Sequence, residues 1–340
     1  MTDAMMKPRL SVIVPVRDAE RTLGESLESC LSQSFGEFEL VVVLNGCSDR
    51  SAEIAKGFAD GDGRVVVMES SEEGGVTEAQ RVGIAAARAD VIARMDADDR
   101  SHPERFAKQW ELLQEDESLG AVGCGVRLIE SQGEGMGRYV DWVNSLGTPE
   151  AIARERFVEC PVIQPSLMMR REALEAAGGY RVRSWAEDHD LILRMLGRGV
   201  RIGKVPEVLL EWRDGPSRLT RCHPMYAEEQ VWLMKAEYLV GLERIRERGV
   251  VISGAGPIGK RLGRHLRGLG VEMHGFFEVS ERRIGQTIGG VPVAGADEVG
   301  VRWRDAVLIS AVGVPGGRGQ VRALAEAAGY LEGEDFWCCC

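Results

Sequence analysis

The chain has 340 residues, which is long for one hydrophobic core and sufficient for two domains, and its 44% hydrophobic and 28% charged residues are typical of a globular protein. Its formal net charge of −11 excludes a broad nucleic-acid-binding surface, because such a surface needs clustered cations. An acidic protein can still bind a phosphorylated substrate if a metal ion supplies positive charge. No apolar run is long enough to cross a bilayer, and residues 1–9 contain no signal-like apolar stretch. We therefore expect a cytoplasmic protein without a transmembrane segment, and we leave peripheral attachment to a membrane open.

The eight cysteines are scattered, except for the three at residues 338–340. None of them forms a C-x-x-C pair with a matching second pair, which argues against a structural zinc site. We expect free thiols, several of them buried. For residues 338–340 we expect a frayed tail without a function.

The predicted elements alternate between strands and helices over the first hundred residues. Apolar runs predict strands at residues 10–14, 38–44, 64–68 and 91–95, and helical periodicity predicts helices at residues 19–31 and 77–88. This alternation predicts a mostly parallel sheet covered by helices on both faces.

Helix starts are well marked in the next hundred residues. Residues 101–104 have the pattern of a capping box with an early proline and predict a helix to about Glu115. Thr148-Pro149 begins another helix, and residues 184–187 form a second capping box. The charged residues 241–249 are a candidate linker. We therefore expect a first domain at residues 1–240 and a second domain at residues 250–340.

Three acidic residues, Asp96, Asp98 and Asp99, follow the apolar strand at residues 91–95. Ligands of α/β sheets bind beyond the carboxyl ends of the strands, and carboxylates packed there repel one another unless a cation joins them. Mg²⁺ or Mn²⁺ prefers oxygen ligands and shares its coordination sphere with substrate phosphates. The alternative is a solvated acidic turn before the next helix, and Asp99 could be only that. Spacing alone leaves the two interpretations nearly equal.

A second acidic cluster, Glu187-Asp188-His189-Asp190, begins a predicted helix, where the helix dipole favours negative charge. The dipole and the capping box explain Glu187. Asp188 has no such local role, so its carboxylate is a candidate general base that deprotonates an acceptor hydroxyl. We expect His189 on the helix surface.

Four segments of the chain resemble the family-2 glycosyltransferases with the GT-A fold. They are SVIVPV at residues 11–16, FELVVVLNGCSD at 38–49, RADVIARMDADDRSHP at 88–103 and QPSLMMRREALEAAGGYRVRSWAEDHD at 164–190. Four motifs in the expected order, within about the first 220 residues, are a strong signal. The resemblance implies a nucleotide-sugar donor, by default a UDP-sugar, a divalent cation (Mn²⁺ or Mg²⁺) and inversion at the anomeric carbon by direct displacement.

The resemblance also assigns residues to the two substrates. The nucleoside of the donor would contact Pro15, Val16 and Arg17, and its base would lie near Asn45. Asp96 would also contact the donor. Asp98 would bind the metal that bridges the diphosphate. Asp188 would be the catalytic base. The acceptor, a glycan, lipid-linked molecule or protein, would lie beside Gln164, Trp185 and Glu187. For Trp185, stacking on a sugar and packing in the core are equally good interpretations.

The chain departs from the family pattern in two places. Family members often have two acidic residues after the second strand, where this chain has Leu44-Asn45. They commonly have a histidine after the strand near Trp212, where this chain has Arg213-Asp214. Asp214 or His223 would then complete the metal sphere, although a loop histidine without a metal role is more common. Arg218 and Arg221 either reach the diphosphate or face solvent.

A glycine-rich turn begins the C-terminal region. A strand at residues 250–253 precedes Gly254, Gly256 and Gly259, which are spaced as G-x-G-x-x-G before a helix. Glu278 lies 24 positions after Gly254, at the end of a second strand, where a ribose-binding carboxylate belongs. The region resembles half of a dinucleotide-binding fold and the N-terminal domain of some sugar acyltransferases. We expect a docking or regulatory domain that binds a nucleotide; tight packing of the turn and dimerisation are the alternatives.

The sequence therefore predicts an α/β protein in which a GT-A domain with a mixed, mostly parallel sheet precedes a small Rossmann-like domain. The expected activity is metal-assisted, inverting sugar transfer with Asp188 as the base. The alternatives are an inactive transferase-like protein that senses a nucleotide and, less favoured, an NAD(P)-dependent oxidoreductase. Homo-oligomers are left open.

Overall fold

The computed structural model describes residues 7–130, 133–215 and 218–340. The chain divides into two compact units. The N-terminal unit contains Met1–Ala153, Pro161–Arg183 and Glu187–Cys222, and the C-terminal unit contains Arg154–Cys160, Ser184–Ala186 and His223–Cys340. The expected linker at residues 241–249 contains a helix, α11 (Glu243–Arg248), with Ile245 buried. The division between the units falls before this segment, at His223. Helix α10 (Glu228–Val240) belongs to the C-terminal unit, where it packs against α12 (Pro257–Gly268).

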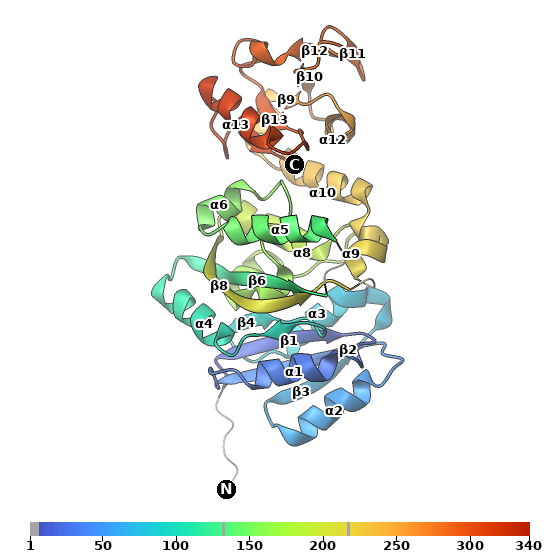
Figure 1. The fold of residues 1–340 in the computed structure, drawn as a ribbon, viewed down its shortest axis with the longest axis vertical. Helices are drawn as coiled ribbons and strands as arrows, with labels where there is room; N and C mark the ends of the chain where they lie inside the picture. The colour runs from blue at the N-terminus through green and yellow to red at the C-terminus, as the bar shows by residue number, and fades with distance from the viewer. Residues whose placement is uncertain (1–6, 131–132, 216–217) are drawn as a thin grey trace. The chain divides into compact units, whose positions relative to one another are not determined.

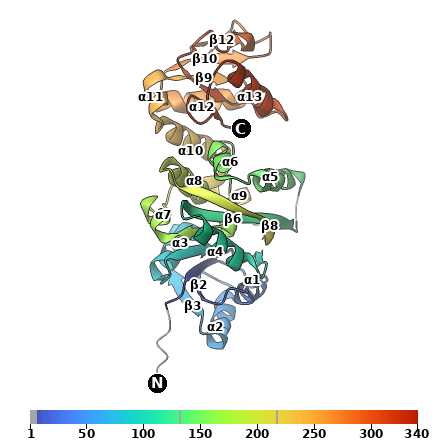
Figure 2. The same ribbon diagram turned by 90° about the vertical axis from the view of Figure 1, so that its left-hand side faces the viewer.

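The N-terminal unit is built on an eight-stranded sheet (Figures 1 and 2). Its order is β3-β2-β1-β4-β7-β6-β8-β5. The strands are β1 (Leu10–Val16), β2 (Phe38–Asn45), β3 (Val65–Ser70), β4 (Val91–Arg94), β5 (Arg100–Ser101), β6 (Leu119–Ile129), β7 (Met168–Arg170) and β8 (Arg201–Arg213). Strands β1 to β4 are parallel and β6 is parallel to β8, whereas β7 and β5 run antiparallel to their neighbours. The mixed, mostly parallel sheet of the prediction is confirmed.

Helices cover both faces of the parallel strands. The helices of this unit are α1 (Leu23–Leu31), α2 (Ser51–Gly61), α3 (Gly75–Ala86), α4 (Arg105–Glu115), α5 (Glu134–Ser145), α6 (Pro149–Arg154), α7 (Arg171–Ala176), α8 (Glu187–Gly197) and α9 (Leu219–Cys222). On one face, Val14 belongs to the same core cluster as Leu27 of α1. On the other face, a Cβ added to Gly83 of α3 would lie 2.5 Å from Ile13 and 3.0 Å from Val43. Two-sided burial is why these strands read as continuous apolar runs.

The helix start predicted at residues 101–104 is wrong in detail. Ser101 lies in β5, opposite Leu210 of β8, and α4 begins at Arg105 without a side-chain cap. Strand pairing with a segment more than a hundred residues away takes precedence over the local capping pattern. The start at Thr148-Pro149 is confirmed, since α6 begins at Pro149 and the Thr148 hydroxyl accepts a hydrogen bond from the Ala151 N–H at 3.2 Å.

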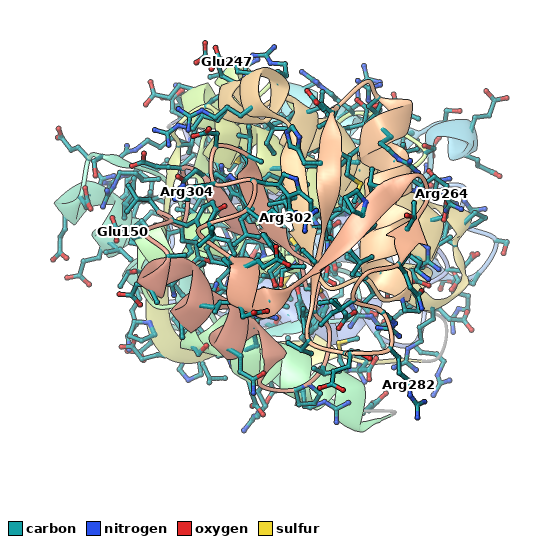
Figure 3. All side chains as sticks on the ribbon, turned by 90° about the horizontal axis from the view of Figure 1, so that it is seen from above. Glu150, Glu247, Arg264, Arg282, Arg302 and Arg304 are labelled. Atoms are coloured by element: carbon teal, nitrogen blue, oxygen red, sulfur yellow. The ribbon has the colours of Figure 1, made fainter. Side chains whose placement is uncertain are left out.

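The C-terminal unit contains a six-stranded sheet with the order β11-β12-β10-β9-β13-β14. Its strands are β9 (Val250–Ser253), β10 (Met273–Glu278), β11 (Thr287–Ile288), β12 (Val291–Gly295), β13 (Val307–Ser310) and β14 (Phe336–Cys338). All pairs are parallel except β11 with β12. Helix α12 connects β9 to β10, and α13 (Gly317–Ala327) connects β13 to β14. Figure 3 shows Arg264, which extends from α12 and pairs with Glu229 of α10 at 2.9 Å.

The expectation of a frayed tail at residues 338–340 is wrong. Cys338 belongs to β14, and Cys338 and Cys339 are completely buried. The Cys339 N–H donates to the Ser310 carbonyl at 2.9 Å, and Lys235 Nζ donates to the Cys339 carbonyl at 3.0 Å. The cysteines described here are free thiols, and burial raises the pKa of Cys338 to about 12. Apolar Phe336 and Trp337 account for the strand. Among the described residues, no helix has the length and apolarity of a membrane span.

Candidate active site

The turn after β4 gathers three carboxylates. One oxygen from each of Asp96, Asp98 and Asp99 lies within 4.8 Å of the others. Asp99 is 1% exposed, and its Oδ1 accepts a hydrogen bond from the Arg213 N–H at 2.8 Å. Its Oδ2 is buried and has no hydrogen-bond partner among the described residues. The idea that Asp99 is only a lead-in to a helix is therefore wrong, because it lies inside the cluster.

The electrostatics of this acidic turn favour a bound cation. Burial and the neighbouring charge of Asp96 raise the pKa of Asp98 to about 6, and Arg218 opposes the shift. Burial, with the charges of Asp98 and Asp96, raises the pKa of Asp99 well above its usual value. All the ligand atoms are carboxylate oxygens, which suit a hard divalent ion such as Mg²⁺ or Mn²⁺. The orphaned Asp99 oxygen and the oxygen-only donor set therefore fit the expected metal.

Two buried arginines lie beneath the acidic turn, and the sequence reasoning missed both. Arg94 ends β4 at 1% exposure and donates to the Ile13 carbonyl at 2.7 Å and to Asp96 Oδ1 at 3.0 Å. Arg105 of α4 is fully buried and donates to the Arg94 carbonyl at 2.7 Å. A buried charge is costly unless it is paired and hydrogen-bonded, so these cations balance the acids. The available signal was an arginine inside the otherwise apolar run at residues 91–95.

Of the two expected additional metal ligands, Asp214 is not part of the cluster that the described residues form. Asp214 is fully buried and pairs with Arg221 at 2.6 Å. His223 belongs to the C-terminal unit, and its Nδ1 accepts a hydrogen bond from the Met225 N–H at 3.3 Å. The metal role of His223 stays a prediction.

The residues expected in the nucleoside pocket lie at the ends of strands β1 and β2. Val16 and Leu44 are register partners, so these strands end at the same edge of the sheet. Val16 is buried in the core, Pro15 is partly buried and Arg17 is exposed. The Asn45 side-chain amide donates to the Ser71 carbonyl at 2.6 Å. The same amide donates to the Ser70 hydroxyl at 3.0 Å, so Asn45 fixes the end of β3. Asn45 is 2% exposed, and its contact with a nucleoside stays a prediction.

A buried amide on α3 was also missed. Gln80 has 0% exposure, and neither its Nε2 nor its Oε1 has a hydrogen-bond partner among the described residues. It lies one helical turn before Gly83, which packs on β1 and β2. An unpaired buried amide is expensive, so its retention calls for an explanation. A single glutamine in a helix gives no sequence signal of this kind.

The expected acceptor residues surround a buried tyrosine. The Gln164 amide donates to the Tyr180 hydroxyl, and Gln164 Oε1 has no partner among the described residues. Burial raises the pKa of Tyr180, and the adjacent Arg94 opposes this shift. The nearby carboxylates of Glu187 and Asp188 raise the Tyr180 pKa further. Gln164 therefore contacts Tyr180, and the charges of Glu187 and Asp188 act on the same hydroxyl.

Helix α8 begins at Glu187, and two expectations about its first turn are wrong. Asp188 has a local role, since its Oδ1 accepts a hydrogen bond from the His189 N–H at 2.7 Å. His189 is buried rather than on the helix surface. Trp185 is also buried and belongs to a segment of the C-terminal unit, so the structure leaves its role in sugar binding a prediction.

The glycine-rich turn of the C-terminal unit is a tightly packed structure. A Cβ on Gly259 would lie 1.9 Å from the Gly254 carbonyl oxygen, and Gly254 itself has φ +104°, whereas Gly256 faces open space. Glu278 Oε2 accepts hydrogen bonds from the Ala255 N–H at 3.2 Å and from Arg283 at 2.9 Å. These contacts use the carboxylate within the turn. Nucleotide binding by Gly254, Gly256, Gly259 and Glu278 stays a prediction.

Comparisons with known proteins agree on one family. The model described as "Glycosyl transferase family 2" matches residues 11–178. The putative glycosyltransferase EpsE of Bacillus subtilis is 31% identical over 218 residues, which are 63% of this chain and 76% of EpsE. Residues 1–349 of S. aureus TarS, solved in complex with UDP-GlcNAc, superpose with a TM-score of 0.53 at 17% identity over 76% of this chain and 71% of that one. The Pyrobaculum calidifontis mannosyltransferase PcManGT, solved with GDP-Man and Mn²⁺, superposes with a TM-score of 0.51 at 22% identity, over 69% of this chain and 62% of that one. At these identities the two structures show a shared fold.

Proposed function

Because the chain belongs to glycosyl transferase family 2 and is a glycosyltransferase, we propose that it moves a sugar from a nucleotide-diphosphate sugar to a hydroxyl acceptor in a metal-assisted, inverting reaction. The observation that carries the proposal is the cluster of Asp96, Asp98 and Asp99 with its unpartnered, buried carboxylate oxygen. The cluster follows β4, beside the ends of β1 and β2, where a donor would bind.

The donor side needs positive charge, because a nucleoside diphosphate leaves as an anion. Asp96, Asp98 and Asp99 would hold the divalent ion, which would neutralise charge that develops on the diphosphate. Two fold neighbours support this assignment, since TarS was solved with UDP-GlcNAc and PcManGT with GDP-Man and Mn²⁺. A UDP-sugar is the first choice of donor, and a GDP-sugar is the second.

The acceptor side needs a base. Asp188 lies in the first turn of α8, where the helix dipole stabilises its ionised form. It would take the proton of the acceptor hydroxyl while the hydroxyl oxygen forms its bond to the anomeric carbon. The bond from that carbon to the diphosphate breaks on the opposite face, and its electron pair leaves with the diphosphate. Direct displacement of this kind inverts the anomeric centre and needs no separate nucleophile.

The test is release of nucleoside diphosphate from a panel of UDP-, GDP-, ADP- and dTDP-sugars, with Mn²⁺ or Mg²⁺ and with EDTA. We expect metal-dependent turnover of one donor class, and its loss in Asp98→Ala. The control is Asp90→Asn, which removes an exposed carboxylate before the same strand and should leave turnover unchanged. Equal turnover in EDTA, or an active Asp98→Ala protein, would refute the metal-assisted reaction.

A further inference from the structure

Arg213, the last residue of β8, contacts the acidic turn that follows β4. Its Nε donates to the Asp98 carbonyl oxygen at 2.7 Å, and its backbone N–H donates to Asp99 Oδ1 at 2.8 Å. Its two terminal nitrogens extend the other way, to Glu25 of α1 at 3.0 Å and to Glu130 after β6. One largely buried arginine thus connects the acidic turn to two other elements of the N-terminal unit.

These contacts determine which oxygens remain available to a cation. The Arg213 N–H occupies Oδ1 of Asp99, and Arg94 occupies Oδ1 of Asp96. Oδ2 of Asp99 is left buried without a partner among the described residues. Each of these two acids is therefore held through one of its oxygens, and the second oxygen of Asp99 stays free to bind a cation. Single-oxygen coordination by carboxylates suits the octahedral geometry that Mg²⁺ requires, with sites left for phosphate.

The backbone at Glu130 supports a positioning role. Glu130 has φ +54°, a left-handed conformation that is uncommon for residues other than glycine. Such conformations persist only where the surrounding contacts hold them in place, and they concentrate at functional sites. Here the Glu130 carboxylate pairs with Arg213.

We propose that Arg213 is a positioning residue, whose side chain holds the acidic turn, through the Asp98 carbonyl oxygen, in the geometry that binds the divalent cation. The contact with Asp99 comes from the Arg213 backbone N–H, which every substitution at this position keeps. The inference rests on the proposed function and deepens it. Arginine suits this task because its planar fork donates several hydrogen bonds in fixed directions, which lysine cannot reproduce. An arginine cannot itself ligate the metal, so it acts through the aspartates. Partners of this kind, one step from the ion, typically control metal affinity by about 10–100-fold.

The experiment measures Mn²⁺ binding to the full chain, with and without UDP, from the electron paramagnetic resonance signal of free Mn²⁺. We expect Arg213→Met and Arg213→Lys to weaken Mn²⁺ binding at least about tenfold at a temperature where both remain folded. The matched control is Arg127→Met. It removes an exposed arginine of β6 that pairs with Glu211, which lies in β8 as Arg213 does. Its Mn²⁺ affinity should stay within about twofold of the wild type, because exposed ion pairs contribute little.

The outcomes separate this inference from the proposed function. If the wild-type protein does not bind Mn²⁺, the proposed function fails and the inference fails with it. If the wild type binds and Arg213→Lys binds equally well, only the positioning role is overturned. If Arg213→Met does not fold, Glu25→Gln weakens the ion pair that orients the Arg213 side chain, by changing its exposed partner. Unchanged Mn²⁺ affinity in both Glu25→Gln and Arg213→Lys would likewise overturn it.

Discussion

Replacing Asp98 with asparagine should stabilise the metal-free protein at neutral pH. The folded pKa of about 6 lies above the unfolded value of 3.8, so the folded state binds the Asp98 proton more tightly. Stability from this group is therefore complete below the unfolded pKa and is lost as the pH rises through the folded pKa. A shift of about two units corresponds to about 3 kcal/mol, which is an upper limit because Asp98 keeps some contact with water.

The assay is urea unfolding in EDTA, at neutral pH and at a pH near the unfolded value. The substituted asparagine cannot ionise, so Asp98→Asn should exceed the wild type in unfolding free energy at neutral pH, by up to about 3 kcal/mol. The difference should shrink towards zero at the acidic pH. Adding Mn²⁺ should stabilise the wild type and leave the variant unchanged, because only a ligand that binds the native state raises stability. A variant that is less stable than the wild type at neutral pH in EDTA would refute the reasoning.

Three further predictions concern other parts of the molecule. Mn²⁺ affinity should fall as the pH drops through about 6, because Asp98 takes up a proton there, and a flat calorimetric pH profile would contradict this. Gln80→Met should raise the unfolding free energy in urea by about 1–2 kcal/mol, because it replaces two unpaired buried polar atoms with apolar ones of similar volume, and a decrease would show that the amide is satisfied. Gly259→Ala should speed hydrogen exchange in β9 and α12, because its Cβ would lie 1.9 Å from the Gly254 carbonyl oxygen, and unchanged exchange there would contradict the packing.

Much of the parallel sheet could be predicted from sequence, because its signal is local. Strand β2 has all eight residues buried, and its centre, residues 40–44, is an unbroken apolar run. The acidic turn was found for the same reason, since it directly follows the apolar strand β4. The separate roles of the three aspartates could not be predicted in this way. The place of Asp99 in the cluster depends on Arg213, which lies 114 positions away in the chain.

The errors share a physical cause, which is that long-range pairing overrides local patterns. Ser101 fits a capping box but pairs in a strand with Leu210. Cys338 looks like a loose end but completes a sheet beside β13. His189 has a helix-surface pattern but is buried. Arg94 was overlooked because its contact with the Ile13 carbonyl, 81 positions away, is not visible in the sequence.

The central claim is that the acidic turn makes donor binding depend on a divalent cation. The most direct measurement is calorimetric titration of the full chain with UDP-GlcNAc and with GDP-mannose, each in Mn²⁺ and in EDTA. Our account predicts that one of these donors binds in Mn²⁺, and that this binding disappears in EDTA and in Asp98→Asn. Binding of equal strength in Mn²⁺, in EDTA and in the Asp98→Asn protein would contradict it.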